Sequence, residues 1–241
     1  MKHEVVDLLA LAAHRDDVEL TCGGTLAKAA RAGHRVGIVD LTRGETGTRG
    51  DAATRAAEAE QAAKALGVAV RLNAELRDAY LANDEASRRR VVELIRITRP
   101  RVVILPFSIG RHPDHRIASE LGRDACYLAG LKKYDAPGEP HRPFKIIYAL
   151  AYREDPVKPT FVVDITDVFE TKMRAVQCYA SQFTGAKAAG EVFPGGEGLY
   201  EQIRIQSAHY GSLIRRPYGE PYFCNETVAV DDIMQLGVAS M

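Results

Sequence analysis

Strand-like and helix-like segments alternate four times along the first half of this chain, and this alternation constrains the fold more than any other feature. The expected strands are Val5–Ala12, Arg35–Leu41, Val68–Leu72 and Arg101–Phe107, and the expected helices are Gly24–Ala32, Thr54–Leu66, Glu85–Thr98 and His112–Ala129. Strands that each lead into a helix are typical of parallel sheets. The sequence therefore predicts an α/β fold with a doubly wound, mostly parallel, Rossmann-like sheet and helices on both faces.

The chain has 241 residues, enough for one large α/β domain. We expect a single domain over residues 1–241. Its core would lie in residues 1–152, and residues 153–241 would complete the sheet and supply surface for substrate and for oligomer contacts. Later strands are expected at Ile146–Tyr152 and Phe161–Ile165, and later helices at Val168–Tyr179 and Gly198–Ile214.

Charge and composition argue against several classes of function. The 32 basic and 32 acidic residues give a formal net charge of zero, without the positive excess typical of nucleic-acid binding. No segment approaches the roughly 20 apolar residues of a membrane span, and the N-terminus lacks a secretory pattern. We expect a cytoplasmic protein that binds neither nucleic acid nor membrane.

Two short strings join histidine to aspartate directly after predicted strands. The segment His14–Glu19 follows the first strand, and the segment Arg111–His115 follows the fourth. In the common strand order 3-2-1-4, the first and fourth strands are neighbours, and the two strings face each other where the strand order reverses. The Gly-rich loop Thr42–Asp51 follows the second strand at the same edge. We predict a ligand site at this edge of the sheet.

The residue types in these strings suit a catalytic metal. His14, Asp17 and His115 would supply two imidazoles and one carboxylate, a set that fits a zinc ion with one position left for water. Fe(II) or Co(II) could use the same ligands. Such an ion acidifies water and polarises a carbonyl oxygen. Asp16 would then act as general base, and His112 would donate to the oxyanion or to the leaving amine.

Other polar residues near the strings are candidates for supporting roles. Asp114 and Glu19 would orient histidines from behind the metal ligands. Arg49, in the Gly-rich loop, and Arg55 are candidate clamps for an anionic part of the substrate. The alternative for each string is structural, since aspartate and other polar residues also cap helices after loops of this kind.

The same strings resemble the signature motifs of the LmbE-like or PIG-L-like zinc deacetylases. His14–Glu19 is similar to the His-Pro-Asp-Asp-x-Glu motif of that family, and His112–His115 is similar to its second motif. The likeness extends to the loop Leu41–Gly50, to Arg55 and to Tyr218–Phe223. Length and loop pattern are most similar to the branch that deacetylates N-acetylglucosaminyl malate in bacillithiol biosynthesis.

The resemblance implies an LmbE-like fold with one catalytic zinc ion. It gives the roles stated above to three zinc ligands (His14, Asp17 and His115), to the general base Asp16, and to His112 and Asp114. It adds Glu45 and Arg142 as candidate substrate-binding residues, and Tyr200 as a candidate tyrosine of the site. It also implies a homo-oligomer, with a hexamer as the expected size. Arg15 departs from the motif: the family has proline there, and proline stiffens the backbone whereas arginine does not.

We therefore predict a zinc-dependent N-deacetylase that acts on a GlcNAc conjugate, first of all N-acetylglucosaminyl malate. Another N-acetyl sugar or a related thiol conjugate is the alternative substrate. A metal-dependent phosphoesterase could use the same ligands, although such enzymes often take two metals and more carboxylates. A non-catalytic sugar- or nucleotide-binding module is compatible with the fold alone, but it would not need Asp16.

Overall fold

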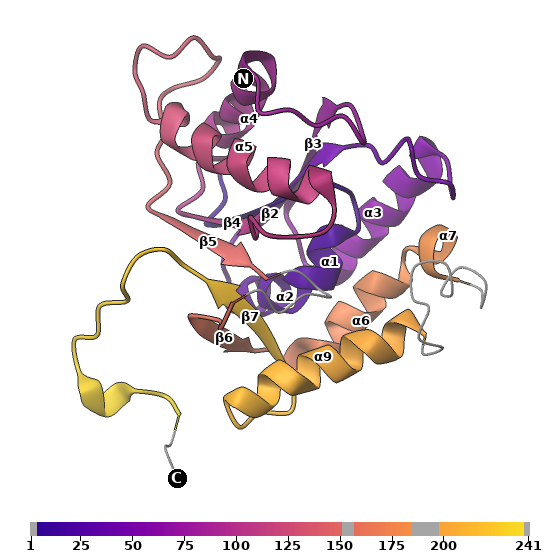
Figure 1. The fold of residues 1–241 in the computed structure, drawn as a ribbon, viewed down its shortest axis with the longest axis vertical. Helices are drawn as coiled ribbons and strands as arrows, with labels where there is room; N and C mark the ends of the chain where they lie inside the picture. The colour runs from indigo at the N-terminus through magenta and orange to yellow at the C-terminus, as the bar shows by residue number, and fades with distance from the viewer. Residues whose placement is uncertain (1–3, 151–156, 185–197, 239–241) are drawn as a thin grey trace.

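The computed structural model describes residues 4–150, 157–184 and 198–238, and it contains one seven-stranded sheet in the order β3-β2-β1-β4-β5-β7-β6 (Figure 1). The strands are β1 Leu8–Ala12, β2 Val36–Thr42, β3 Val70–Leu76, β4 Val102–Pro106, β5 Lys145–Ala149, β6 Phe161–Asp164 and β7 Gly219–Phe223. Strands β1 to β5 pair in parallel, and β7 runs antiparallel to both of its neighbours. The predicted order of the first four strands is confirmed.

Helices cover both faces of the sheet. They are α1 Asp17–Thr21, α2 Gly23–Arg31, α3 Ala52–Leu66, α4 Glu85–Thr98, α5 Pro113–Ala129, α6 Phe169–Gln177, α7 Ala180–Phe183 and α9 Leu199–Leu213. Helices α4 and α5 lie on one face, and α2, α3, α6 and α9 lie on the other (Figure 1). None of the described helices is long and apolar enough to cross a membrane.

The central strands carry side chains that are buried on both faces. All seven residues of β2 are buried, as expected for a strand covered by helices on each side. Alternate residues of β1 enter different cores: Leu9 and Leu11 pack toward α4 and α5, whereas Ala10 and Ala12 pack toward α2. This rigid centre holds the loops that follow β1, β2 and β4.

Local capping explains where the main helices begin and end. Asp51 accepts a hydrogen bond from the Thr54 amide at the start of α3, and Gly67 ends that helix in the left-handed conformation (φ 74°). Helix α4 has the predicted bounds. Two short elements differ from the expectation: helix α1 begins within the first histidine–aspartate string, and β7 forms from a segment with no strand-like pattern.

Candidate active site

The two histidine–aspartate strings meet at the carboxyl edge of the sheet, as predicted. The first follows β1 and the second follows β4, and these two strands pair directly from Leu8↔Val102 to Ala10↔Ile104. The turn after β1 places His14 against His115 of helix α5, 101 residues later in the chain. The site therefore forms at the point where the strand order reverses.

His14, Asp17 and His115 bring three ligand atoms together. His14 Nδ1 lies 3.3 Å from Asp17 Oδ2, and His115 Nε2 lies 3.1 Å from Asp17 Oδ1. The two ring nitrogens are 3.3 Å apart. Ligand atoms around a tetrahedral zinc ion, each about 2.0–2.1 Å from the metal, lie ~3.3 Å from one another. The spacing of the two nitrogens fits two ligand positions of such a tetrahedron, and each nitrogen lies against a different oxygen of Asp17.

The electrostatics of the three residues favour a bound cation. Burial alone would lower the pKa of His14, but Asp17 and the nearby carboxylates outweigh it and raise the pKa to about 12. Burial opposes protonation of His115 as well, yet Asp17 raises its pKa. The two imidazoles in turn hold the pKa of Asp17 well below its usual value, against the effect of burial. Positive charge is therefore stabilised at this point.

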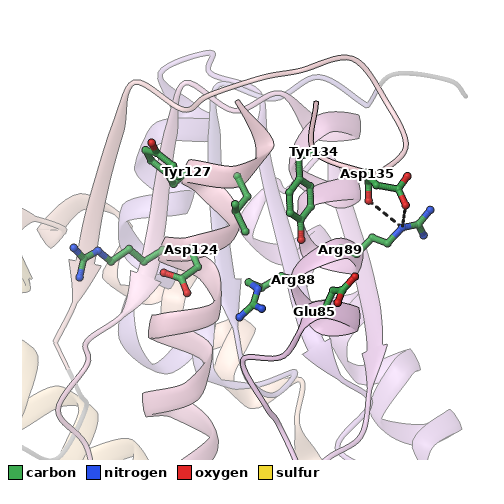
Figure 2. Close-up of a pocket in the computed structure, with 9 residues that line it drawn as sticks. Glu85, Arg88, Arg89, Asp124, Tyr127, Tyr134 and Asp135 are labelled. Atoms are coloured by element: carbon green, nitrogen blue, oxygen red, sulfur yellow. Dashed lines mark hydrogen bonds and ion pairs between the residues drawn. The ribbon is translucent and has the colours of Figure 1, made fainter. Parts of the chain in front are cut away.

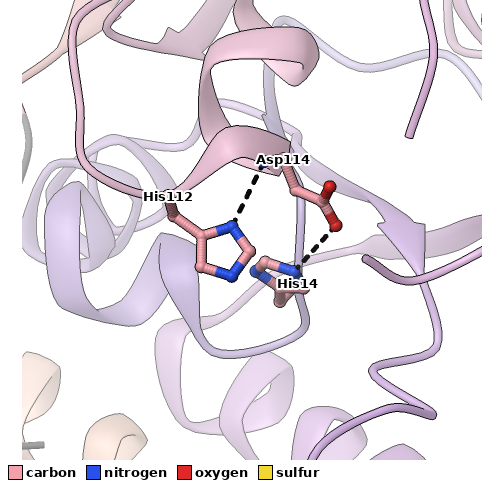
Figure 3. A group of neighbouring side chains, drawn as sticks. All are labelled: His14, His112 and Asp114. Carbon is pink, nitrogen blue, oxygen red and sulfur yellow. Dashed lines mark hydrogen bonds and ion pairs between the residues drawn. The ribbon is translucent and has the colours of Figure 1, made fainter. Parts of the chain in front are cut away.

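The opposite nitrogen of His14 faces two further carboxylates. His14 Nε2 lies 3.1 Å from Asp78 Oδ1. It also lies 3.5 Å from Asp114 Oδ2 (Figure 3). Asp114 was predicted to orient a histidine; its carboxylate lies beside His14, and the role stays a prediction. Carboxylates behind a metal-bound imidazole fix its tautomer and its orientation. His14, His112 and Asp114 also lie close enough to form a second candidate ligand set that shares His14.

Asp78 is a site residue that no sequence motif identified. It follows the carboxyl end of β3, the same edge as the other loops, and this position was the signal that could have identified it. Its Oδ2 atom accepts hydrogen bonds from the Thr46 amide and hydroxyl, at 2.9 and 2.6 Å. Its own amide donates to Glu45 Oε1 at 2.9 Å. Asp78 therefore ties the Gly-rich loop to His14.

Asp16 forms an ion pair with an arginine. Arg55 Nη2 lies 3.3 Å from Asp16 Oδ1, and Arg55 Nη1 donates to the Gly44 carbonyl at 3.0 Å. Gly44 has φ +70°, and a Cβ there would meet the guanidinium at 2.0 Å, so glycine is required. Burial and Asp17 raise the pKa of Asp16, and Arg55 opposes them. Asp16 is thus a half-buried carboxylate whose negative charge is stabilised first by Arg55 and then by His14.

Arg55 itself is only 4% exposed, because its guanidinium is enclosed by the loop and by Asp16. The structure thus gives it an internal partner, and its contact with substrate stays a prediction.

His112 caps helix α5, and this role fixes its ring. The Asp114 amide donates to His112 Nδ1 at 3.2 Å, so a neutral ring carries its proton on Nε2. Burial and the neighbouring His14 and His115 lower the pKa of His112, which favours the neutral form. The rings of His112 and His14 are 4.9 Å apart between centroids. His112 is therefore a neutral donor beside the metal ligands.

A buried network holds the backbone next to Asp16. The Arg15 carbonyl accepts hydrogen bonds from Arg71 Nη2 and from Tyr179 Oη. Arg71 also binds both oxygens of Asp40, and it donates to Glu19 Oε1 at 2.7 Å. The prediction that Glu19 orients a histidine is therefore wrong: its bonded oxygen faces Arg71 and Tyr179.

The remaining predicted residues lie in different places. Glu45 and Arg49 belong to the Gly-rich loop at the site edge. Arg142 stacks on Tyr127 near the far end of α5, 4.4 Å from the ring centroid, so it does not reach the site of its own chain. Tyr200 packs against the apolar cluster of α3 and α6. The roles of Glu45, Arg49 and Arg142 in substrate binding stay predictions.

The comparisons with known proteins agree with this geometry. Residues 9–126 match the family described as PIG-L: GlcNAc-PI de-N-acetylase. A diacetylchitobiose deacetylase from Thermococcus kodakarensis is 32% identical over 237 residues, which cover 90% of this chain and 82% of that protein. The chain belongs to the PIG-L deacetylase family. It is an N-deacetylase, a hydrolase of a metal-dependent family.

Solved structures of similar proteins have the same fold. A conserved protein from Thermus thermophilus, TT1542, is 37% identical with a TM-score of 0.85, and the match covers 94% of this PIG-L family chain and 98% of that one. An N,N'-diacetylchitobiose deacetylase from Pyrococcus horikoshii is 28% identical with a TM-score of 0.76, over 91% and 83% of the two chains. The predicted LmbE-like α/β fold is confirmed.

Proposed function

We propose that this PIG-L family chain is a zinc-dependent enzyme that removes the acetyl group from an N-acetylglucosamine conjugate. One observation carries the proposal. The nitrogens of His14 and His115 lie 3.3 Å apart, each lies 3.1 to 3.3 Å from an oxygen of Asp17, and the adjacent carboxylate of Asp16 contacts Arg55. A site that only bound a metal would have no use for this second carboxylate.

Each residue has a distinct task in the hydrolysis. A bound zinc ion would supply Lewis-acid polarisation of the acetyl carbonyl and acidification of water. Asp16 accepts the proton of the attacking water, while Arg55 keeps its carboxylate oriented. His112 donates its Nε2 proton as a hydrogen bond to the developing oxyanion. The amide C–N bond then breaks, the nitrogen takes up the proton that Asp16 accepted, and acetate and the free sugar amine leave.

An acidic aglycone is our first choice for the remainder of the substrate, as in N-acetylglucosaminyl malate of bacillithiol biosynthesis. The family resemblance of the loops supports it. Arg43 and Arg111, both exposed, belong to loops at the site edge and would attract a carboxylate. N,N'-diacetylchitobiose is the second candidate, favoured by the 32% identical deacetylase that is named for it.

The test is a comparison of acetate release from both compounds by the zinc-loaded protein. We expect kcat/KM for N-acetylglucosaminyl malate to exceed that for N,N'-diacetylchitobiose by at least about tenfold, because each decade needs only about 1.4 kcal/mol of added transition-state binding. The reverse order would assign the second candidate. Failure to release acetate from either compound, by protein that holds zinc, would contradict the proposed substrate class.

A further inference from the structure

A cavity of about 460 Å³ lies beside the candidate active site, between helix α5 and the ends of strands β4, β5 and β7. Phe107 and Ser108 line it, and they follow β4 directly before the second histidine–aspartate string. Ser119 also lines it, four residues after His115 on α5, which is about one helical turn or ~6 Å along the axis. Neither histidine–aspartate string lines the cavity, so it is a neighbour of the metal site and not a part of it.

Three packed aromatic rings form an apolar wall of this cavity, which we call the aromatic cavity. The ring centroid of Phe223 lies 5.4 Å from that of Phe107 and 6.5 Å from that of Tyr148. Phe107 and Tyr148 meet edge to face and are 7% and 6% exposed, so the surrounding core holds both rings in place. A fixed aromatic wall suits a ligand with an apolar face.

Ser119 brings an unpaired hydroxyl group to the aromatic cavity. The residue is only 2% exposed, yet its hydroxyl forms no hydrogen bond with any residue that the structure describes. A buried hydroxyl without a partner is unfavourable, and a ligand that hydrogen-bonds to it removes this cost. Because a serine hydroxyl both donates and accepts, it suits a ligand that carries hydroxyl groups of its own.

Charged groups of both signs surround the aromatic cavity. Arg123 lines it, and none of the described carboxylates forms an ion pair with this arginine. Glu120 and Asp124 line it as well, and Asp124 Oδ2 accepts a hydrogen bond from Asn83 Nδ2 at 2.8 Å. One arginine against two carboxylates gives no excess of positive charge for an anion. The mixture of donors and acceptors instead favours a neutral ligand with several hydroxyl groups.

The hydroxyl of Tyr148 forms a polar end to the aromatic wall. Burial raises the pKa of Tyr148, whereas the charge of Arg123 and a hydrogen bond with the Asn225 side chain oppose this shift. Arg123 and Asn225 therefore lie close to the Tyr148 hydroxyl, and both also line the cavity. A ligand that packs on the aromatic wall meets these polar groups at its edge.

A larger cavity of about 820 Å³ shares Arg123 and Asp124 with the aromatic cavity but differs from it in polarity (Figure 2). Its other arginines have partners within the chain. Arg88 Nη1 donates to a carbonyl of the loop before α4 at 2.7 Å, and Arg89 Nε donates to the Asp135 carbonyl at 3.1 Å. Figure 2 shows Arg89 against Asp135. These contacts already satisfy the arginines, so the aromatic cavity is the better candidate for a ligand.

We propose that the aromatic cavity is a second sugar-binding site, which takes a neutral pyranose ring. Such a ring has an apolar C–H face that packs on the aromatic wall. The hydroxyl groups at its edge bond to Ser119, to Arg123 and to the two carboxylates. In a conjugate with two sugar rings, the site holds the ring that is not deacetylated, and this use rests on the proposed function. Binding of a sugar alone requires neither the metal nor the reaction.

Saturation-transfer NMR with methyl β-D-glucopyranoside tests the site, because this sugar has no N-acetyl group and is not a substrate of the proposed reaction. The wild type should bind it saturably. Ser119→Ala removes the unpaired hydroxyl, and we expect Kd to rise about two- to tenfold, the range for one hydrogen bond. Ser207→Ala is the matched control, because Ser207 is a buried serine of α9, and it should leave Kd unchanged. No saturable binding by the wild type, or the same Kd for both variants, would overturn the proposal.

Arg123→Met tests the site at an exposed position, where the fold does not depend on the side chain. It removes the donors and keeps the apolar stem, so we expect Kd for the same sugar to rise about tenfold. Arg174→Met, at an exposed position of α6, is the control and should have no effect. An unchanged Kd for Arg123→Met would refute the site. Binding of the sugar by protein that releases no acetate would instead refute the proposed function and leave the sugar site standing.

Discussion

Asp16 and Asp17 are adjacent in sequence, yet they contact different partners. Asp17 lies between the two imidazoles of His14 and His115, whereas Asp16 faces the guanidinium of Arg55. The turn from β1 into α1 separates the two side chains, because Asp16 precedes the helix and Asp17 begins it. One carboxylate can therefore hold the cation while the other accepts a proton.

The substitution Asp16→Asn should separate these two functions. It removes the proton acceptor and keeps the shape, so we expect kcat to fall about 10²–10⁴-fold. The zinc content of the purified variant, measured by mass spectrometry, should equal that of the wild type, because the three ligands are intact. A kcat within tenfold of the wild-type value would remove Asp16 from its proposed role.

Arg15 occupies the position where the family motif has proline, and side chains from other elements form hydrogen bonds with the Arg15 carbonyl. Arg71 and Tyr179 both donate to this carbonyl, and the Arg15 side chain donates to the Ala52 carbonyl at 2.8 Å. Proline restrains a backbone through its ring. In this chain, hydrogen bonds from β3 and from the end of α6 supply the restraint at the same residue.

Tyr179→Phe should therefore weaken metal binding. The variant keeps the buried ring and loses one hydrogen bond to the metal loop, so we expect the zinc Kd to rise about tenfold, as for other partners behind a metal ligand. The control is Tyr218→Phe, which loses a hydrogen bond to Arg204 away from the site. Equal zinc affinities in calorimetric titrations of the two variants would show that the Tyr179 hydrogen bond does not support metal binding.

At the scale of elements, Glu220 of β7 joins the C-terminal part of the chain to helix α2. Its carboxylate accepts from the Gly24 and Thr25 amides at 2.8 and 2.7 Å, and it pairs with Lys172 of α6 at 2.6 Å. Both members of the pair are at least 98% buried. An internal carboxylate thus occupies the start of α2, where the Gly23–Gly24 pair could otherwise suggest a phosphate site.

Glu220→Gln should destabilise the protein strongly. It leaves the ammonium of Lys172 buried without its counter-charge, and such a loss costs about 3–5 kcal/mol. Glu226→Gln, in the exposed pair with Lys145, is the matched control and should cost less than about 1 kcal/mol. Urea denaturation measures both free energies of unfolding. Similar losses for the two variants would argue against the importance of the buried pair.

Much of the element order could be predicted because it depends on local signals. Apolar runs, glycine stops and caps identified four strands and four helices, and the topology rules placed β1 beside β4. Strand β7 could not be predicted in this way: it contains Gly219 and Pro221, which argue against a strand, and it forms because β5 and β6 pair with it from both sides.

In the site, too, residues in short motifs could be predicted, whereas residues defined by contacts far along the chain could not. The three predicted metal ligands and Asp16 lie in short motifs, and the structure brings His14, Asp17 and His115 together. Asp78 and Arg71 carry no motif, because their roles depend on contacts 31 to 64 residues away along the chain. Glu19 was misassigned for the same reason, since its partner Arg71 lies 52 residues later.

At the scale of the whole molecule, metal binding should contribute to stability. A ligand that binds only the folded chain stabilises it by about 2.7 kcal/mol at a free concentration one hundred times its Kd. We therefore expect a chelator to lower the Tm of the zinc-loaded protein in calorimetry. His115→Ala, which lacks one ligand, should be insensitive to the chelator. A Tm decrease of the same size in this variant would contradict metal binding at the predicted site.

The position of the metal is the most direct test of the account, and anomalous X-ray scattering at the zinc edge measures it in crystals grown with zinc. We predict one peak, about 2.0–2.2 Å from a nitrogen of His14, an oxygen of Asp17 and a nitrogen of His115. A peak held by His14, His112 and Asp114 instead, or no peak in this region, would contradict the account.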